Sequence, residues 1–182
     1  MSYSNSDLIH AFPASLRDDA LEVISALPQT SWNPGTFSLR VRDENISIPH
    51  RIYHDPILID AARLTAQQTI LLDCLLTRHH SGFIREKHLI KIIGCDQDWV
   101  PPFVVQLVGE YVIEILSVIQ KESVNLNPRL YRTFLVDNPA FFALTKQRVV
   151  SYWNCYHAWR RRDDYFGFQI LEFFDRLLTK ND

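Results

Sequence analysis

Apolar residues recur with the spacing of an α-helix through most of this chain from residue 56 onward. This periodicity constrains the fold more than any other feature of the sequence. The segments "AQQTILLDCLLTRHH" and "FIREKHLIKII" each place large apolar side chains three and four positions apart. Pro101 and Pro128 open further helical segments, because proline is tolerated in the first turn of a helix. We therefore expect residues 56–182 to form a helical core.

One segment has the two-residue period of a β-hairpin, and it lies near residues 36–53. Residues 37–41 alternate apolar and polar side chains, residues 43–45 supply the turn, and residues 46–48 alternate again. An isolated hairpin is marginally stable in water, so it must pack on helices. The expected fold class is mainly α, a multi-helix bundle or short helical array with one small antiparallel hairpin.

The length of 182 residues suits a single domain. Within it we expect an appendage over residues 1–55, which holds the hairpin and a helix over residues 15–27 with Ser15 as its N-cap. The turn-rich loop "PQTSWNPG" follows that helix at Pro28. The helical core over residues 56–182 makes up the rest.

Composition excludes several classes of protein. The net charge is −2, which argues against binding nucleic acid or an anionic membrane through the whole chain. The N-terminus lacks the basic and apolar regions of a signal peptide, and no apolar run has the roughly 18 residues that a membrane-spanning helix needs. The three cysteines form no CxxC pair. We expect a cytoplasmic protein.

Residues 65–120 resemble HEAT-type repeats, which join two amphipathic helices by a short turn. In "SGFIREKHLIKII", Ile84 and Arg85 stand where that family often has Val-Arg, and "WVPPFVVQLV" is similar to the first helix of a following repeat. The resemblance implies a HEAT-like helical array. The chain lacks a clear repeat period and carries a hairpin, so we expect no regular solenoid. It is not identified with any specific protein family.

The stretch "TRHHSGFIREKH" concentrates histidines and arginines around a break at Ser81-Gly82. Basic side chains are favourable at a helix C-terminus, where Arg78, His79 and His80 stand. Arg85 lies in the first turn of the next helix and can pair with its neighbours. We interpret this stretch as helix capping and ion pairing, with a partner-binding surface as the alternative.

A metal site would need glutamates in addition to these histidines. Glu110 and Glu114 are four positions apart in a long helix predicted from Pro101 to about residue 122, so their carboxylates would be neighbours. With His79, His80 or His88 they could form a carboxylate–histidine centre. The Glu-x-x-His pairs of di-iron bundles are absent from the sequence. We expect no cofactor and no metal.

The segment "SYWNCYHAWRRRDDY" places Arg160, Arg161 and Arg162 directly after Trp153, Tyr156, His157 and Trp159. Aromatic rings interleaved with arginine can stack on bases and bind phosphates. Alternatively, the aromatic side chains are core and the arginines complement a helix C-terminus. Two aspartates follow at once and neutralise two of the charges.

The predicted function is protein–protein interaction, and one specific version is a small bacterial immunity-type protein that neutralises a toxin. The alternatives are a small enzyme that uses Glu110, Glu114 and nearby histidines, and nucleic-acid binding through Arg160–Arg162. The residues that we expect on the binding surface are Arg78, His79, His80, Arg85, Arg160, Arg161 and Arg162. The sequence does not identify the partner.

Overall fold

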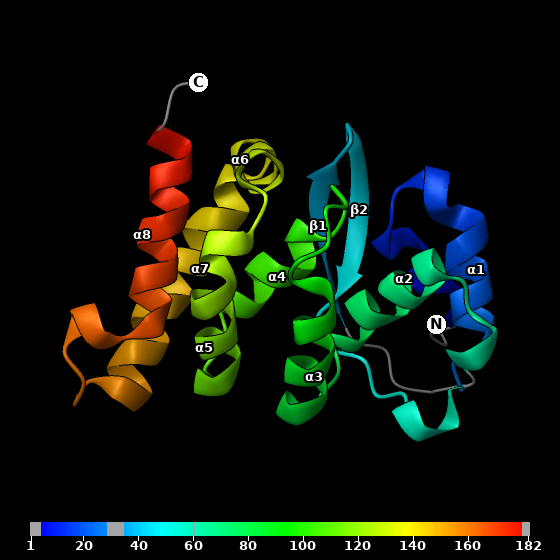
Figure 1. The fold of residues 1–182 in the computed structure, drawn as a ribbon, viewed down its shortest axis with the longest axis horizontal. Helices are drawn as coiled ribbons and strands as arrows, with labels where there is room; N and C mark the ends of the chain where they lie inside the picture. The colour runs from blue at the N-terminus through cyan, green and yellow to red at the C-terminus, as the bar shows by residue number, and fades with distance from the viewer. Residues whose placement is uncertain (1–4, 29–34, 60, 180–182) are drawn as a thin grey trace. The chain divides into compact units, whose positions relative to one another are not determined.

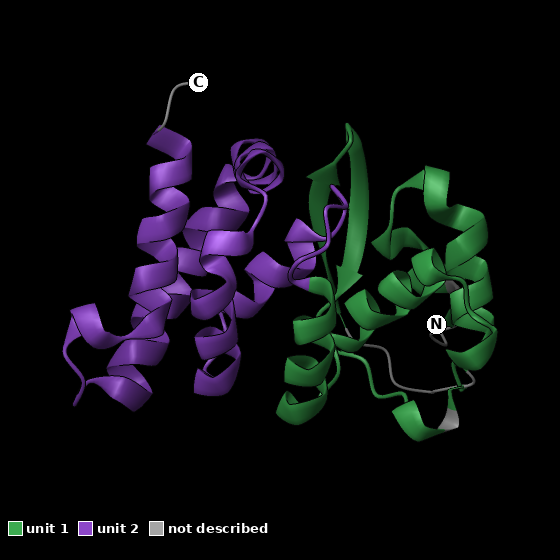
Figure 2. Cartoon of the chain, in the orientation of Figure 1, with its two compact units in different colours: residues 1–92 green, residues 93–182 purple. Residues whose placement is uncertain are grey.

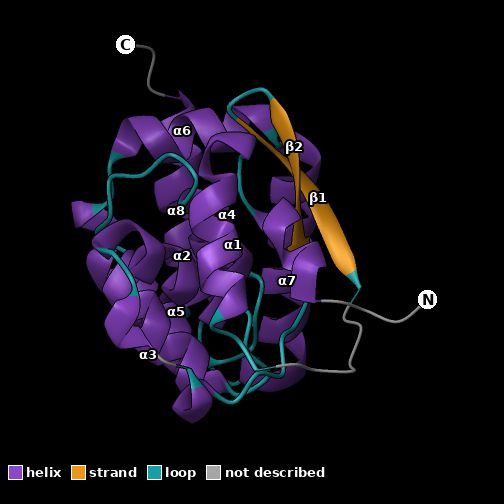
Figure 3. Ribbon diagram, turned by 90° about the vertical axis from the view of Figure 1, so that its right-hand side faces the viewer, coloured by secondary structure: helices purple, strands orange, loops and turns teal. Residues whose placement is uncertain are grey.

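A computed structural model describes residues 5–28, 35–59 and 61–179. The described chain is mainly helical and contains one antiparallel sheet of two strands, which confirms the predicted fold class (Figures 1 and 3). No helix among the described residues is long and apolar enough to cross a membrane.

The chain divides into two compact units, Met1–Ile92 and Ile93–Asp182 (Figure 2). The first unit joins the hairpin to the helices that flank the break at Ser81-Gly82, so the division falls well after the predicted one at residue 55. The single domain over residues 1–182 stays a prediction.

Within its described residues, the first unit packs three α-helices and the hairpin together. Helix α2 packs against both α1 and α3, and strand β2 packs against the 3₁₀ turn Asn5–Ala11. The bounds of the regular elements are α1 Arg17–Ser25, β1 Thr36–Val41, β2 Glu44–Pro49, α2 Ala66–Leu76 and α3 Gly82–Ile92. Shorter 3₁₀ turns cover Ala14–Leu16, Pro56–Leu58 and Ala61–Arg63.

The hairpin turns at Arg42-Asp43, not at the predicted residues 43–45. Val41 pairs with Glu44, and both turn residues have positive φ, 52° and 65°. Positive φ at both central residues defines the type I′ turn, whose twist matches that of the flanking strands. The sequence lacks the Asn-Gly or Asp-Gly signal of this turn, which explains the misplaced prediction.

Local capping is present at α2 but not at α1. The Thr65 hydroxyl accepts from the Gln68 backbone N–H, and the Gln68 side chain accepts in return from the Thr65 backbone N–H, which completes a capping box. Ser15 does not cap α1, because α1 begins at Arg17 and Ser15 lies in the preceding 3₁₀ turn; its hydroxyl accepts a hydrogen bond from Arg42 at 2.9 Å. The loop predicted after Pro28 lies mostly in residues 29–34, outside the described residues.

The second unit is a cluster of five helices within the described residues. Helices α4 and α8 each pack against α5, α6 and α7, and the 3₁₀ turn Ser123–Asn125 follows α5. The bounds are α4 Pro101–Val108, α5 Ile113–Glu122, α6 Pro128–Asp137, α7 Pro139–Tyr152 and α8 Phe166–Thr179. Prolines stand at the first position of α4, α6 and α7, where their missing N–H has no intrahelical acceptor to lose.

The long helix predicted from Pro101 to about residue 122 is broken. Helix α4 ends at Val108 and α5 begins at Ile113, so Glu110 lies in the connecting turn and Glu114 in the first turn of α5. The two glutamates therefore do not share one helix face, and only Glu110 is buried. The prediction failed because apolar spacing continues unbroken through the turn.

Candidate functional site

The predicted cluster around Ser81-Gly82 ties the first unit together through buried hydrogen bonds. Arg78 has no exposed surface, and its guanidinium donates to the carbonyl of Pro49 at 3.2 Å and to that of His50 at 2.7 Å. The backbone beside it pairs with Ile52, which donates to the Arg78 carbonyl. Arg78 therefore joins the end of α2 to the end of β2, and it is not available to a partner.

His79 is buried beside it with both ring nitrogens engaged. Nε2 donates to the carbonyl of His54 at 3.0 Å, while Nδ1 accepts from the backbone N–H of Ser81. This pattern requires the neutral ring. Burial, with further effects from neighbouring His80 and Arg85, lowers the pKa of His79 to about 4. A neutral imidazole with both nitrogens hydrogen-bonded to the backbone has a structural role.

The same hinge is closed from the other side by Arg85, in α3. Its Nη1 donates to the carbonyl of His79 at 2.8 Å and to that of His80 at 2.9 Å. Arg85 is also buried. Of the residues predicted for a binding surface in this unit, His80 is the exposed one, and its ring stacks on Tyr53 with centroids 5.3 Å apart. The predicted surface around the hinge is therefore mostly interior.

His88 forms part of a second buried group in this unit. Its Nδ1 faces the carboxylate of Asp73, which also receives Lys91 at 3.0 Å. Asp73 and His88 are both buried, whereas Lys91 is half-exposed along its side chain. The group joins α2 to α3, with two donors on one buried carboxylate.

The five residues considered for a metal site are divided between the two units. His79, His80 and His88 lie in the first unit, and Glu110 and Glu114 lie in the second. Among the described residues, no group of three or more His, Cys, Asp or Glu side chains is placed to hold a metal ion.

In the second unit, three tyrosines from two distant segments gather at the surface. Tyr111 lies between α4 and α5, Tyr152 ends α7, and Tyr156 follows it. Their ring centroids are 5.8 Å apart for Tyr111–Tyr152 and Tyr111–Tyr156, and 6.2 Å for Tyr152–Tyr156. Tyr111 is 53% exposed and Tyr156 is 59% exposed. We call these three residues the tyrosine cluster.

The end of α7 widens into a π-helical turn, Trp153–His157, which carries Tyr156. Single π-helical turns are rare in α-helices and occur frequently at functional sites. The turn is anchored to α8 and to the residue before it, because Trp153 packs edge-on against Phe168 and His157 stacks on the buried Tyr165 at 5.1 Å. The same burial raises the pKa of Tyr165 to about 12. The exposed rings are thus held on a fixed base.

Trp159 follows the π-helical turn and is 76% exposed. The guanidinium carbon of Arg160 lies 4.7 Å from the centre of its ring, a cation–π contact, and the Arg160 carbonyl accepts from Trp153 at 3.3 Å. The sequence predicted this segment as a surface. It did not predict Tyr111, because no local signal links residue 111 to residues 152–156.

The remaining arginines of the predicted run are exposed, but their charge is partly balanced. Arg161 pairs with Asp163 at 3.8 Å, and both side chains are about 80% exposed, at 81% and 79%. Arg162 lies over the ring of Phe168, with its guanidinium carbon 4.4 Å from the ring centre. We call Tyr111, Tyr152, Tyr156, Trp159, Arg160 and Arg161 the aromatic–arginine surface.

Comparison with known proteins gives no match: no family model, no curated protein and no solved structure is significantly similar to the chain. The resemblance of residues 65–120 to HEAT repeats therefore stays a prediction.

Proposed function

We propose that this chain is a protein-binding module and that the aromatic–arginine surface is where its partner docks. The observation that carries the proposal is the exposure of Trp159, Tyr156 and Tyr111 on a unit whose other large rings are mostly packed inside. Tyrosine, tryptophan and arginine are the residues most enriched among those that dominate binding energy at protein interfaces.

The energetics favour a partner that covers these rings. Each large aromatic side chain contributes roughly 2–3 kcal/mol when it is fully removed from water, before the costs of association are subtracted. The rings lose little side-chain entropy on binding, because Tyr111, Tyr152 and Tyr156 already contact one another. A preorganised surface of this kind favours association over non-specific contact.

The local charge supports a protein partner over a nucleic acid. Asp163 already pairs with Arg161, and the whole chain carries a net charge of −2. Binding to nucleic acid draws most of its affinity from lysine and arginine side chains that neutralise backbone phosphates and are not already paired with a carboxylate of the protein. The narrower prediction, an immunity-type inhibitor in the cytoplasm, stays a prediction within this proposal.

Site-specific photocross-linking in the native cell tests the proposal. A photoreactive benzoylphenylalanine would replace Tyr156 in one variant and Val124 in a matched control, since Val124 is 81% exposed in the same unit but outside the surface. We expect a discrete protein adduct at position 156 and not at position 124, and mass spectrometry would identify it.

Trp159→Ala in the Tyr156 photoprobe variant should reduce the adduct several-fold. Equal adducts at both positions, or an adduct that Trp159→Ala leaves unchanged, would overturn the proposal. Nuclease treatment that removes the adduct would show nucleic-acid binding instead. A metal assay of the purified protein tests the enzyme alternative separately.

A further inference from the structure

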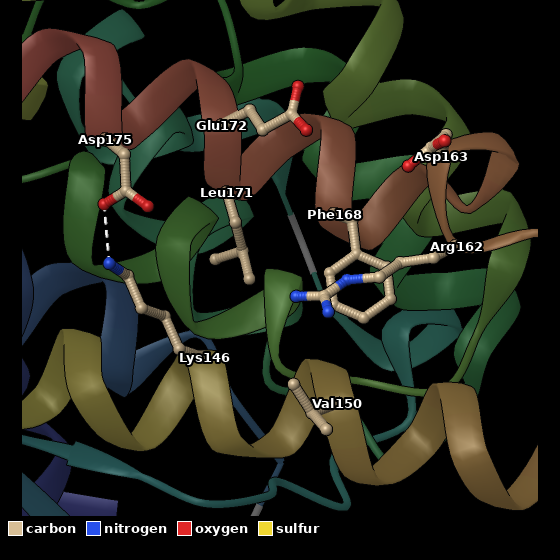
Figure 4. A pocket seen from close by; sticks show the side chains of 8 residues that line it. All are labelled: Lys146, Val150, Arg162, Asp163, Phe168, Leu171, Glu172 and Asp175. Carbon is tan, nitrogen blue, oxygen red and sulfur yellow. Dashed lines mark hydrogen bonds and ion pairs between the residues drawn. The ribbon is translucent and has the colours of Figure 1, made fainter.

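A small pocket opens in the second unit between α7, α8 and the turn before α8 (Figure 4). Its volume is about 200 Å³. Pockets for drug-sized ligands and cofactors have roughly 300–1,000 Å³. The pocket therefore suits one amino-acid side chain better than a cofactor. Val150 and Leu171 supply apolar walls, and Val150 is 41% exposed.

Three carboxylates and two cations line the pocket, and most of them are already paired or directed elsewhere. Lys146 and Asp175 form an ion pair at 2.6 Å, shown by the dashed line in Figure 4. Asp163 faces Arg161, outside the pocket, at 3.8 Å. The carboxylate of Glu172 points away from the space between Lys146 and Arg162 (Figure 4).

Arg162 is the exception. Its guanidinium lies against the ring of Phe168 and points toward the space bounded by Leu171 and Val150. Among the described residues, no carboxylate pairs with it. A guanidinium that lies over an aromatic ring can keep N–H donors free for a carboxylate, in the fork geometry that matches it.

We propose that this pocket takes a glutamate or aspartate side chain of the partner protein, with the carboxylate on Arg162 and the methylene carbons against Val150 and Leu171. The proposal rests on the proposed function, because the acidic side chain belongs to the partner that docks on the aromatic–arginine surface. Arg162 directly follows Arg161 of that surface. Lys146 stands on the opposite side of the pocket, where its charge is balanced by Asp175, so Arg162 carries the recognition of the carboxylate.

A titration of the full-length protein by NMR tests this inference directly. The ligands are the capped tripeptide acetyl-Gly-Glu-Gly-amide and its matched glutamine and lysine counterparts. We expect the glutamate peptide to give saturable shifts of the Arg162 Nε–Hε signal and of the Val150 and Leu171 methyl signals, with millimolar affinity. The glutamine peptide should bind about tenfold more weakly or not measurably.

Variants separate the pocket from general charge effects. Arg162→Gln should abolish the shifts, whereas the matched control Arg129→Gln, at an exposed arginine of α6 that does not line the pocket, should leave them nearly unchanged. Glu172→Gln should strengthen binding of the glutamate peptide, because it removes a negative charge from the lining of the pocket. Preferential binding of the lysine peptide that Glu172→Gln abolishes would overturn the proposal and assign the pocket to a basic side chain. Equal binding of the glutamate and glutamine peptides would also overturn it.

The cross-linking experiment distinguishes the two proposals. If Trp159→Ala reduces the adduct at position 156 while Arg162→Gln neither reduces it nor abolishes peptide binding, the binding module stands and the acidic side chain is wrong. If the glutamate peptide binds through Arg162 but no adduct forms at position 156, the pocket stands and the docking surface is wrong.

Discussion

The Nδ1 atom of His79 accepts a hydrogen bond from the backbone N–H of Ser81 at 3.0 Å, so this ring holds the turn between α2 and α3 in its neutral form. Its other nitrogen donates to the His54 carbonyl. A proton on Nδ1 would turn the acceptor into a second donor that faces the Ser81 N–H. The hinge is therefore sensitive to acid.

We expect the free energy of unfolding to fall as the pH drops. The pKa of His79 is about 4 in the folded chain and about 6.5 when unfolded, so the unfolded chain binds the extra proton in this window. Stability rises with pH between these values, and the contribution is complete above about pH 6.5. The contribution of His79 to the free energy of unfolding is at most about 3 kcal/mol. Burial also lowers the pKa of His54, which acts in the same direction.

Urea unfolding across this range, together with NMR titration of the His79 ring, checks the prediction. His79→Gln should reduce the slope of unfolding free energy against pH. An unchanged slope in this variant, or a ring that titrates near 6.5 in the folded protein, would contradict the assigned hydrogen bonds.

Asp73 should be far more important for stability than an exposed aspartate of the same unit. Asp73→Asn removes the buried charge that receives His88 and Lys91, and we expect a loss of about 2–4 kcal/mol in unfolding free energy. The matched change Asp43→Asn breaks an exposed pair with Arg40 and should cost less than about 1 kcal/mol. Asparagine tolerates the positive φ of residue 43. Chemical denaturation of both variants decides the matter, and similar losses would refute the buried role of Asp73.

Features that depend on neighbouring residues were predictable from the sequence. Pro101 opens α4, as predicted, because its fixed φ acts within one turn of the chain. The break at Ser81-Gly82 also lies where the sequence places it. At these points the spacing of apolar residues and the residues that begin or end a helix predict the same boundary.

Features that depend on distant residues were not predictable. Arg78 is charged and follows a helix, which favours an exposed capping role, yet its acceptors are carbonyls at Pro49 and His50. Tyr111 likewise joins Tyr152 and Tyr156 only after α4, α5 and α7 have packed. Neither partner is encoded in the local pattern of residues.

Gly167 should not tolerate a methyl group. A Cβ atom at this position would lie 2.6 Å from the Tyr165 ring and 2.8 Å from a Val149 methyl, closer than packed atoms approach. We expect Gly167→Ala to destabilise the protein by about 1–3 kcal/mol, although alanine favours helices. Gly94→Ala is the control, because a Cβ there has no neighbour within 4 Å, and its effect should stay within about 0.5 kcal/mol. Thermal unfolding of both proteins measures the difference, and equal melting temperatures would show that α8 can shift at low cost.

Cys155 offers a test of the docking surface that leaves Trp159 and the other aromatic residues of the Tyr156 photoprobe variant unchanged. It is exposed in the π-helical turn directly before Tyr156, whereas Cys95 is half-buried and Cys74 is buried. An aromatic maleimide should therefore react first at Cys155, and only unfolding should release Cys74, as mass spectrometry of the labelled peptides would report. The bulky label should reduce the cross-linked adduct at position 156 several-fold. Methanethiosulfonate, which adds only a methylthio group, should leave most of it. A bulky label on Cys155 without effect on the adduct would place the partner elsewhere on the unit.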